Sequence, residues 1–214
     1  MSDIFQEVDE DLRRDRTTQF MKRYGGIFGA VLLLLVAATA GWQAWQGWRK
    51  SQREAETGQL VSALSQTAAG PQQGIDALSS YAGKAPADLA VLARLNEAAL
   101  RVGEGKTAEA VAIYDSVASN TAAQATYRDL ATLLSIMHQI GSGDAAQLQA
   151  RLQPLTVDAS PWRFSAREMT GLLAARAGER ERARTLFQQL ADDSLAPSGV
   201  RSRAADLAAL YGKS

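Results

Sequence analysis

The chain has no cysteine and only one histidine, His138. Without cysteine it can build neither a disulfide framework nor a thiolate metal site, so its fold depends on apolar packing. His138 as a catalytic base would need a partner acid and a nucleophile that no motif supplies. Asp192 and Asp193 are better explained as a helix end than as a ligand pair. We therefore predict no catalytic residue, no cofactor and no metal site.

The sequence also lacks the features of phosphate and nucleic-acid binding. Gly103 and Gly105 have no third glycine, and they follow a helical segment where a dinucleotide motif requires a strand. Lysine plus arginine and aspartate plus glutamate number 23 each, which gives a net charge of zero. No basic stripe with stacking aromatics is visible, and we predict no nucleic-acid partner. Residues 150–214 do carry a mild excess of arginine, explained either by solvated helix faces or by a docking surface for an acidic partner.

Residues 24–48 contain no Asp, Glu, Lys, Arg or His. A helix of this length reaches about 37 Å, enough to cross a hydrocarbon core of about 30 Å. Aromatic residues stand at both ends of the run, where amphipathic rings prefer the headgroup region. These membrane-interface residues are Tyr24, Trp42, Trp45 and Trp48. The segment is predicted to be a transmembrane anchor in contact with lipid.

Two other interpretations of this apolar run are a buried core helix and a cleaved signal peptide. The second has some support, because Ala38-Thr39-Ala40 fits a small-x-small cleavage pattern. However, residues 1–23 carry six acidic side chains, whereas the start of a signal peptide is short and basic. We interpret the run as a retained anchor.

The orientation follows from basic residues near the ends of the span. Five precede it and three follow it, and the side richer in Lys and Arg stays in the cytoplasm. Residues 1–23 are thus predicted to be a cytoplasmic N-terminal segment, with an apolar stripe through Ile4, Val8 and Leu12 that suits a partner-dependent helix. The larger C-terminal part would lie outside the cytoplasm, which in a bacterium with two membranes is the periplasm.

Everything beyond the anchor is predicted to be helical. Residues 49–70 are polar and prolong the anchor as a juxtamembrane helix, which ends because Pro71 cannot continue it. Residues 71–214 form short helices of good helix formers, separated by Gly or Pro breaks, with no strand-like alternation. We predict an all-α fold in which one N-terminal transmembrane helix precedes a domain of helical hairpins.

The hairpins repeat. Residues 95–114 align with residues 168–187 at an offset of 73, close to two units of about 34 residues with a few inserted. A small residue before the turn allows close helix approach, a glycine ends the first helix, and an alanine and an aromatic share one face of the second helix. The paired residues are Ala98 and Gly171, Gly105 and Gly178, Ala110 and Ala183, and Tyr114 and Phe187.

This spacing resembles the tetratricopeptide repeat, in which these positions are small, Gly, Ala and aromatic. Departures from the pattern are Arg94 and Arg167 in place of the first-helix Trp, and Val117 and Leu190 in place of a second-helix Ala. Residues 124–157 are interpreted as a degenerate unit with its turn at 141–144. The alternative is an Ala-rich helical bundle without true repeats.

The whole arrangement resembles the ancillary subunits of the bacterial SecYEG translocon. The resemblance rests on the architecture, on Gly41-Trp42-Gln43-Ala44-Trp45 at the end of the anchor, and on Val8-Asp9-Glu10-Asp11-Leu12-Arg13-Arg14 near the start. It implies a single-pass inner-membrane protein that associates with the translocon and with periplasmic chaperones of exported envelope proteins. It supplies no catalytic residues.

We therefore predict a non-enzymatic, membrane-anchored interaction scaffold whose stacked hairpins present a groove to protein clients. First-helix residues should line the groove, with Arg94, Asn96, Arg101, Arg128 and Arg167 as candidates. One alternative is a self-associating structural scaffold of another envelope complex, which requires a homo-oligomer. The other is an enzyme with a deep pocket around His138 and a nearby carboxylate.

Overall fold

A computed structural model describes the backbone of residues 3–212 and the side chains of residues 30–212. Over that range the chain is all-helical, as predicted, with nine α-helices and two short 3-10 helices. The α-helices are α1 (Asp3–Ser65), α2 (Pro71–Ala82), α3 (Ala87–Gly103), α4 (Thr107–Ala118), α5 (Ala125–Gln139), α6 (Ala145–Leu152), α7 (Arg163–Arg176), α8 (Arg180–Asp192) and α9 (Ser198–Tyr211). The 3-10 helices are η1 (Gln66–Ala68) and η2 (Gln153–Leu155).

The chain divides into two compact units, Met1–Ala55 and Glu56–Ser214. In the first unit the side chains from residue 30 onward are exposed. Val31 to Val36 leave 49 to 71% of their surface uncovered, and α1 is the one helix of the described chain that is long and apolar enough to cross a membrane. Its one hydroxyl in this stretch, on Thr39, is satisfied within the helix by the carbonyls of Leu35 and Val36. An apolar run that no described part of the chain covers, and whose hydroxyl is satisfied within the helix, is suited to lipid.

The second unit begins earlier than the sequence predicts. The predicted boundary lies after residue 70, yet the last turns of α1 pack against α2, with Leu60 and Ala63 buried in one cluster with Leu78. The Tyr81 hydroxyl also donates to the Glu56 carbonyl at 2.8 Å. Residues 56–65 are therefore the first helix of a hairpin whose second helix is α2. Gly70 lies in the turn between them, and Pro71 occupies the first position of α2.

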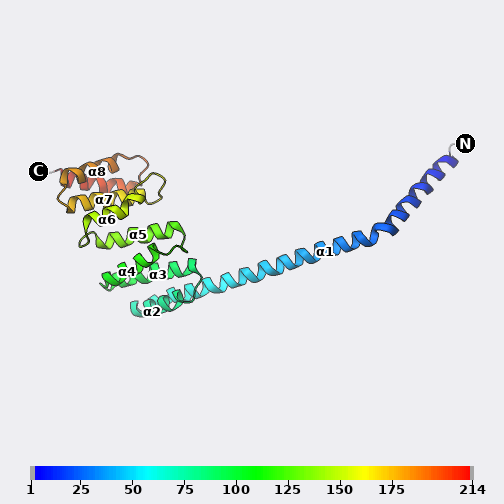
Figure 1. Cartoon of the computed structure of the whole chain (residues 1–214), viewed down its shortest axis with the longest axis horizontal. Coiled ribbons are helices and arrows are strands. Elements are labelled where there is room, and N and C mark those ends of the chain that lie inside the picture. The colour runs from blue at the N-terminus through cyan, green and yellow to red at the C-terminus, as the bar shows by residue number, and fades with distance from the viewer. Residues whose placement is uncertain (1–2, 213–214) are drawn as a thin grey trace. The chain divides into compact units, whose positions relative to one another are not determined.

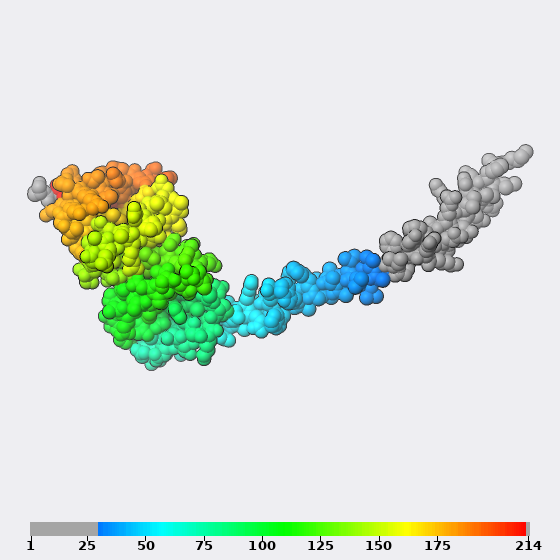
Figure 2. Space-filling model, in the orientation of Figure 1, coloured from blue at the N-terminus to red at the C-terminus, as the bar shows by residue number. Residues whose placement is uncertain are grey.

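Figure 1 shows the helices of the second unit stacked in chain order, and Figure 2 shows the same order on its surface. Each helix packs on the next one along the chain, from the end of α1 through α9. The elements form four hairpins: the end of α1 with α2, α3 with α4, α5 with α6, and α7 with α8. Helix α9 then covers α7 and α8. Three core clusters lie between successive hairpins, as in a repeat solenoid, and two lie between the last hairpin and α9.

The two ends of the hairpins form different edges of this unit. Turns within hairpins gather on one edge, where Arg176 at the end of α7 donates to the carbonyls of Ile140 and Gly143 in the α5–α6 turn. Loops between hairpins gather on the other edge, where Arg167 contacts the α6–α7 loop and the α8–α9 loop. Arginine side chains thus tie together turns that are distant in sequence.

Candidate protein-interaction surface

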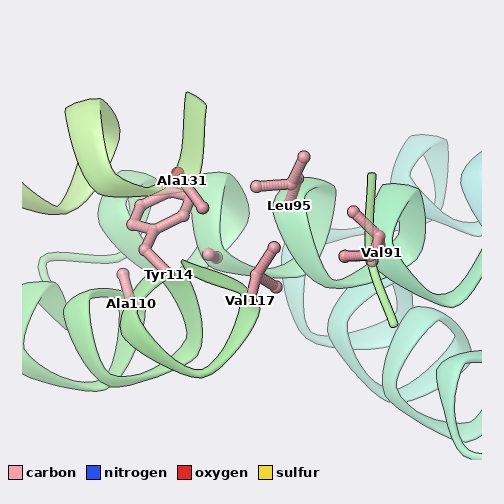
Figure 3. Close-up of a cluster of buried hydrophobic side chains, with 8 residues drawn as sticks. Val91, Leu95, Ala110, Tyr114, Val117 and Ala131 are labelled. Atoms are coloured by element: carbon pink, nitrogen blue, oxygen red, sulfur yellow. The ribbon is translucent and has the colours of Figure 1, made fainter. Parts of the chain in front are cut away.

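The eight predicted repeat-packing residues lie at matching places in two hairpins. Ala98, Ala110 and Ala183 are fully buried, and Tyr114 and Phe187 are the two largest fully buried side chains of the described residues. Gly105 and Gly178 adopt φ values of 75° and 83°, the left-handed conformation that glycine tolerates best. Figure 3 shows Ala110 and Tyr114 of α4 facing Ala131 of α5.

Gly171 is required by a close approach of two helices. A Cβ atom at this position would lie 2.6 Å from Cε1 of Phe187, nearer than real Cβ contacts allow. The aromatic ring of α8 thus packs directly on the backbone of α7. In the α3–α4 hairpin the corresponding residues are Ala98 and Tyr114. The α3–α4 crossing therefore has room for the methyl group of an alanine, and the α7–α8 crossing does not.

The other two hairpins use the same positions with different residues. Counting from the start of each second helix, the fourth, eighth and eleventh residues are buried throughout. In α2 they are Gly74, Leu78 and Tyr81. Counted from the start of α6 they are Leu148, Leu152 and Leu155, the last of which lies in η2. Sequence comparison missed the α1–α2 hairpin because leucine stands where the aromatic is expected. The α1–α2 hairpin is identified instead by burial of the same three positions, counted from the start of its second helix, as in the other hairpins.

The structure does not bring the five predicted groove residues onto one surface. Arg94, Arg101 and Arg167 point towards second helices or their loops: Arg94 lines a cleft with residues of α2 and α4, Arg101 pairs with Glu109 of α4, and Arg167 pairs with Asp193 after α8. Asn96 is exposed and donates to the Leu92 carbonyl of its own helix at 2.8 Å. Arg128 has a buried Nε without a hydrogen-bond partner in the described part of the chain.

Two clefts open between successive second helices, on the side that these arginines face. One, of about 200 Å³, lies between α2 and α4 over α3. Its lining is Ser79, Ala82, Gly83, Arg94, Glu97, Ile113 and Ser116. The other, of about 380 Å³, lies between α6 and α8 over α7, and its lining is Ala146, Gln149, Ala150, Gln153, Thr156, Thr170 and Arg182. Both are shallow and lined by a mixture of polar and apolar side chains, which suits side chains of a protein partner better than a purely apolar ligand.

Glu97 is buried at the wall of the first cleft, with 6% of its surface exposed. Its carboxylate accepts from Arg101 at 2.7 Å, one helical turn along α3. This hydrogen bond is the largest cause that raises the pKa of Arg101 above its ordinary value. Buried charge needs such a partner, so Glu97 is committed to Arg101 and not to a ligand.

His138 occupies a packing position. Its ring stacks on Tyr114 with the centroids 5.9 Å apart and the planes 5° from parallel. Within the part of the chain that the structure describes, no group of three His, Cys, Asp or Glu side chains could hold a metal ion. A polar network lies one turn away, where Asp115 of α4 accepts from Ser135 of α5 and from Arg151 of α6, each at 2.6 Å. This network ties three helices together.

The predicted membrane-interface tryptophans are exposed on α1. Trp42 and Trp45 lie 5.5 Å apart between ring centroids, and the Arg49 guanidinium stacks over Trp45 at 4.0 Å. Trp48 keeps 62% of its surface exposed. The side chain of Tyr24 lies outside the described residues. Aromatic rings and a guanidinium side by side match the chemistry of a membrane–water boundary.

In a comparison with protein families, the chain matches the tetratricopeptide repeat-like domain over residues 18–208. No curated protein and no solved structure matches the chain significantly. The family match covers both the repeat hairpins and most of the helix that precedes them.

Proposed function

The chain belongs to the tetratricopeptide repeat-like domain family, and on this premise we propose that it is a single-pass inner-membrane scaffold accessory to the SecYEG translocon. Repeat domains of this kind generally mediate protein–protein interaction and are typically not enzymes. The proposed role is to hold periplasmic chaperones or newly exported clients beside the translocon.

One observation carries this proposal: the same helix, α1, contains an apolar run that none of the described residues cover and supplies the first half of the first repeat hairpin. The anchor and the interaction domain are therefore joined without a loop. Tethering raises the effective concentration of the repeat surface for partners in or near the same membrane. We infer that this neighbour is the translocon, because the N-terminal segment and the end of the anchor resemble those of translocon ancillary subunits.

The test is co-purification of the full chain after in-cell crosslinking and mild detergent extraction. The matched control replaces residues 24–48 with an unrelated transmembrane helix of equal length, which keeps the topology and the repeat domain. We expect translocon subunits with the natural chain and their loss with the replaced helix. Recovery of only further copies of the chain would instead support a self-associating structural scaffold. Recovery of translocon subunits with both chains would mean that a segment other than residues 24–48 makes the contact.

Orientation can be measured separately because the chain has no native cysteine. Single substitutions Thr17→Cys and Ser119→Cys place one thiol on each side of the anchor. With the N-terminus in the cytoplasm, a membrane-impermeant maleimide added to cells with a permeabilised outer membrane labels the second variant alone. Labelling of Thr17→Cys alone would reverse the proposed topology.

A further inference from the structure

Arg94 and Arg167 occupy the same position in two hairpins, 73 residues apart, and this equivalence extends to the loops around them. After α8, the backbone N–H of Leu195 donates to the side chain of Asp193, and that of Ala196 donates to the Asp193 carbonyl. After α4, Ala122 and Ala123 donate in the same way to Asn120. Ala123 and Ala196 are also buried to the same extent, at 6% and 5% exposure. Asn120 is thus the structural counterpart of Asp193.

The two arginines nevertheless have different surroundings. Arg167 is held by Asp158 at 2.5 Å, by Asp193 at 3.6 Å and by the Thr156 carbonyl at 3.1 Å. At the same offset of 73 residues, the positions equivalent to these two acids in the α3–α4 hairpin are occupied by Ala85 and Asn120. Asn120 already uses its side-chain oxygen to cap Ala122, and its remaining polar atom is an amide nitrogen, which cannot accept a hydrogen bond from arginine.

Arg94 consequently makes no ion pair with any side chain that the structure describes. It lines the cleft of about 200 Å³ between α2 and α4, whose other walls are small or hydroxyl-bearing side chains together with Ile113 and Glu97. Glu97, the acid in that wall, is neutralised by Arg101. The cleft therefore presents a guanidinium with unused donors and room for about one side chain.

We propose that the Arg94 cleft binds the carboxylate of an Asp or Glu side chain on a protein partner. Arg167 shows within the same molecule what an arginine at this position binds when an acid is within reach. The geometry of a guanidinium matches a carboxylate, and a half-buried site strengthens the contact. This proposal rests on the proposed scaffold function and specifies how the scaffold contacts its partner. An acidic side chain of the partner would lie between α2 and α4, the second helices of the first two hairpins.

The first experiment observes Arg94 directly in the full chain, in detergent micelles, by the NMR signal of its Nε–H group. The probe is N-acetylglutamate α-amide, which carries one side-chain carboxylate, and the matched control is N-acetylglutamine α-amide. Both are added up to about 50 mM, since a single charge-assisted contact gives a millimolar Kd or weaker. We expect a saturable shift of the Arg94 signal with the acid alone. No shift, or an equal shift with the amide or with sodium chloride, overturns the proposal.

The variant Asn120→Asp gives this experiment an internal competitor. It places a carboxylate where Asp193 stands relative to Arg167, so the acid probe should no longer shift the Arg94 signal. The control Asp193→Asn changes the equivalent loop of the other hairpin and should leave the response of Arg94 intact. An undiminished response in Asn120→Asp would mean that Asn120 does not neighbour Arg94 as proposed.

The second experiment tests a protein partner in cells, with a photo-crosslinking amino acid at the exposed rim residue Ser79. We expect a discrete crosslinked partner, with a yield about tenfold lower in Arg94→Gln and in Asn120→Asp, since a hydrogen bond to a charged group is lost. Reversing the charge at the crosslinked acid, together with Arg94→Glu, should restore the yield. Yields unchanged by both variants, or no crosslink at all, overturn the cleft proposal, while partners recovered by co-purification would still support the scaffold.

Discussion

The α3–α4 and α7–α8 hairpins have the same skeleton and different charges. Both bury a small residue, an alanine and an aromatic at matching places, with Ala98, Ala110 and Tyr114 in one and Gly171, Ala183 and Phe187 in the other. They differ in the loops: one carries acids that neutralise its arginine, and the other carries Ala85 and Asn120. The difference teaches that packing defines the repeat, whereas loop residues decide which repeat has a charge left for a partner.

The largest expected effect comes from the shared skeleton. Phe187→Ala and Tyr114→Ala each empty the centre of a core cluster, and each should lower the free energy of unfolding by about 3–5 kcal/mol. The measurement is urea denaturation of the full chain in detergent micelles, followed by near-UV circular dichroism. A loss below about 1 kcal/mol for one of the two would show that the hairpins are not equivalent in packing.

A smaller effect distinguishes the two helix crossings. Gly171→Ala should destabilise by about 1–3 kcal/mol, since its Cβ atom would meet the Phe187 ring and overpacking exceeds the gain in helix propensity. The matched control is Gly103→Ala at the end of α3, where an added Cβ has no neighbour within 4 Å. We expect that control to be neutral or slightly stabilising. Equal stability of both variants would mean that α7 and α8 can move apart without cost.

The charge difference should have a modest effect on stability. Asp193→Asn removes a half-exposed partner of Arg167 and should cost up to about 1 kcal/mol, while Asn120→Asp should stabilise the α3–α4 hairpin by a similar amount. Arg94→Gln should leave the free energy of unfolding unchanged, since this side chain has no acidic partner to lose within the described part of the chain. The same urea titrations at low and high salt give the measurement, and added salt should reduce both nonzero effects. A marked loss of stability in Arg94→Gln would assign that side chain a structural role.

The smallest expected effect depends on pH. Burial raises the pKa of Tyr114 above its ordinary value near 10. The neutral phenol is therefore favoured in the folded state, and the stability that this gives is complete below about pH 10 and declines as the pH rises further. Tyr114→Phe should reduce this alkaline loss in urea titrations at pH 9 to 11, a range chosen around the reference value of about 10. An identical pH profile in the variant would exclude Tyr114 as its source.

Much of the fold could be predicted from the sequence because the relevant signals are local. Gly and Pro breaks define the helix ends, and a run without charge defines the apolar part of α1. The repeat was visible only where its residue types were conventional, at Tyr114 and Phe187. The α1–α2 hairpin was hidden, since Leu78 fills the aromatic position and the preceding helix is continuous with the anchor.

The groove residues could not be predicted, because an arginine in a helical pattern does not reveal its neighbours. Arg94 and Arg167 are indistinguishable by position in the repeat. Their partners come from loops before and after the hairpin, and only the structure brings Asp158 and Asp193 to the same guanidinium. Composition identifies the charges, but tertiary contacts determine which of them are neutralised.

The sequence by itself determined that this protein is helical, repetitive and equipped with a segment long enough to cross a membrane. These properties depend on periodicity, on turn residues and on the absence of charge over residues 24–48, and all three signals are local in the sequence. Only the tertiary structure decided that residues 56–65 belong to the repeat unit and that Arg94 has no acidic partner among the described residues, where Arg167 has two. Burial and ion pairing are contacts between segments far apart in sequence, and such contacts exist only once the hairpins are stacked.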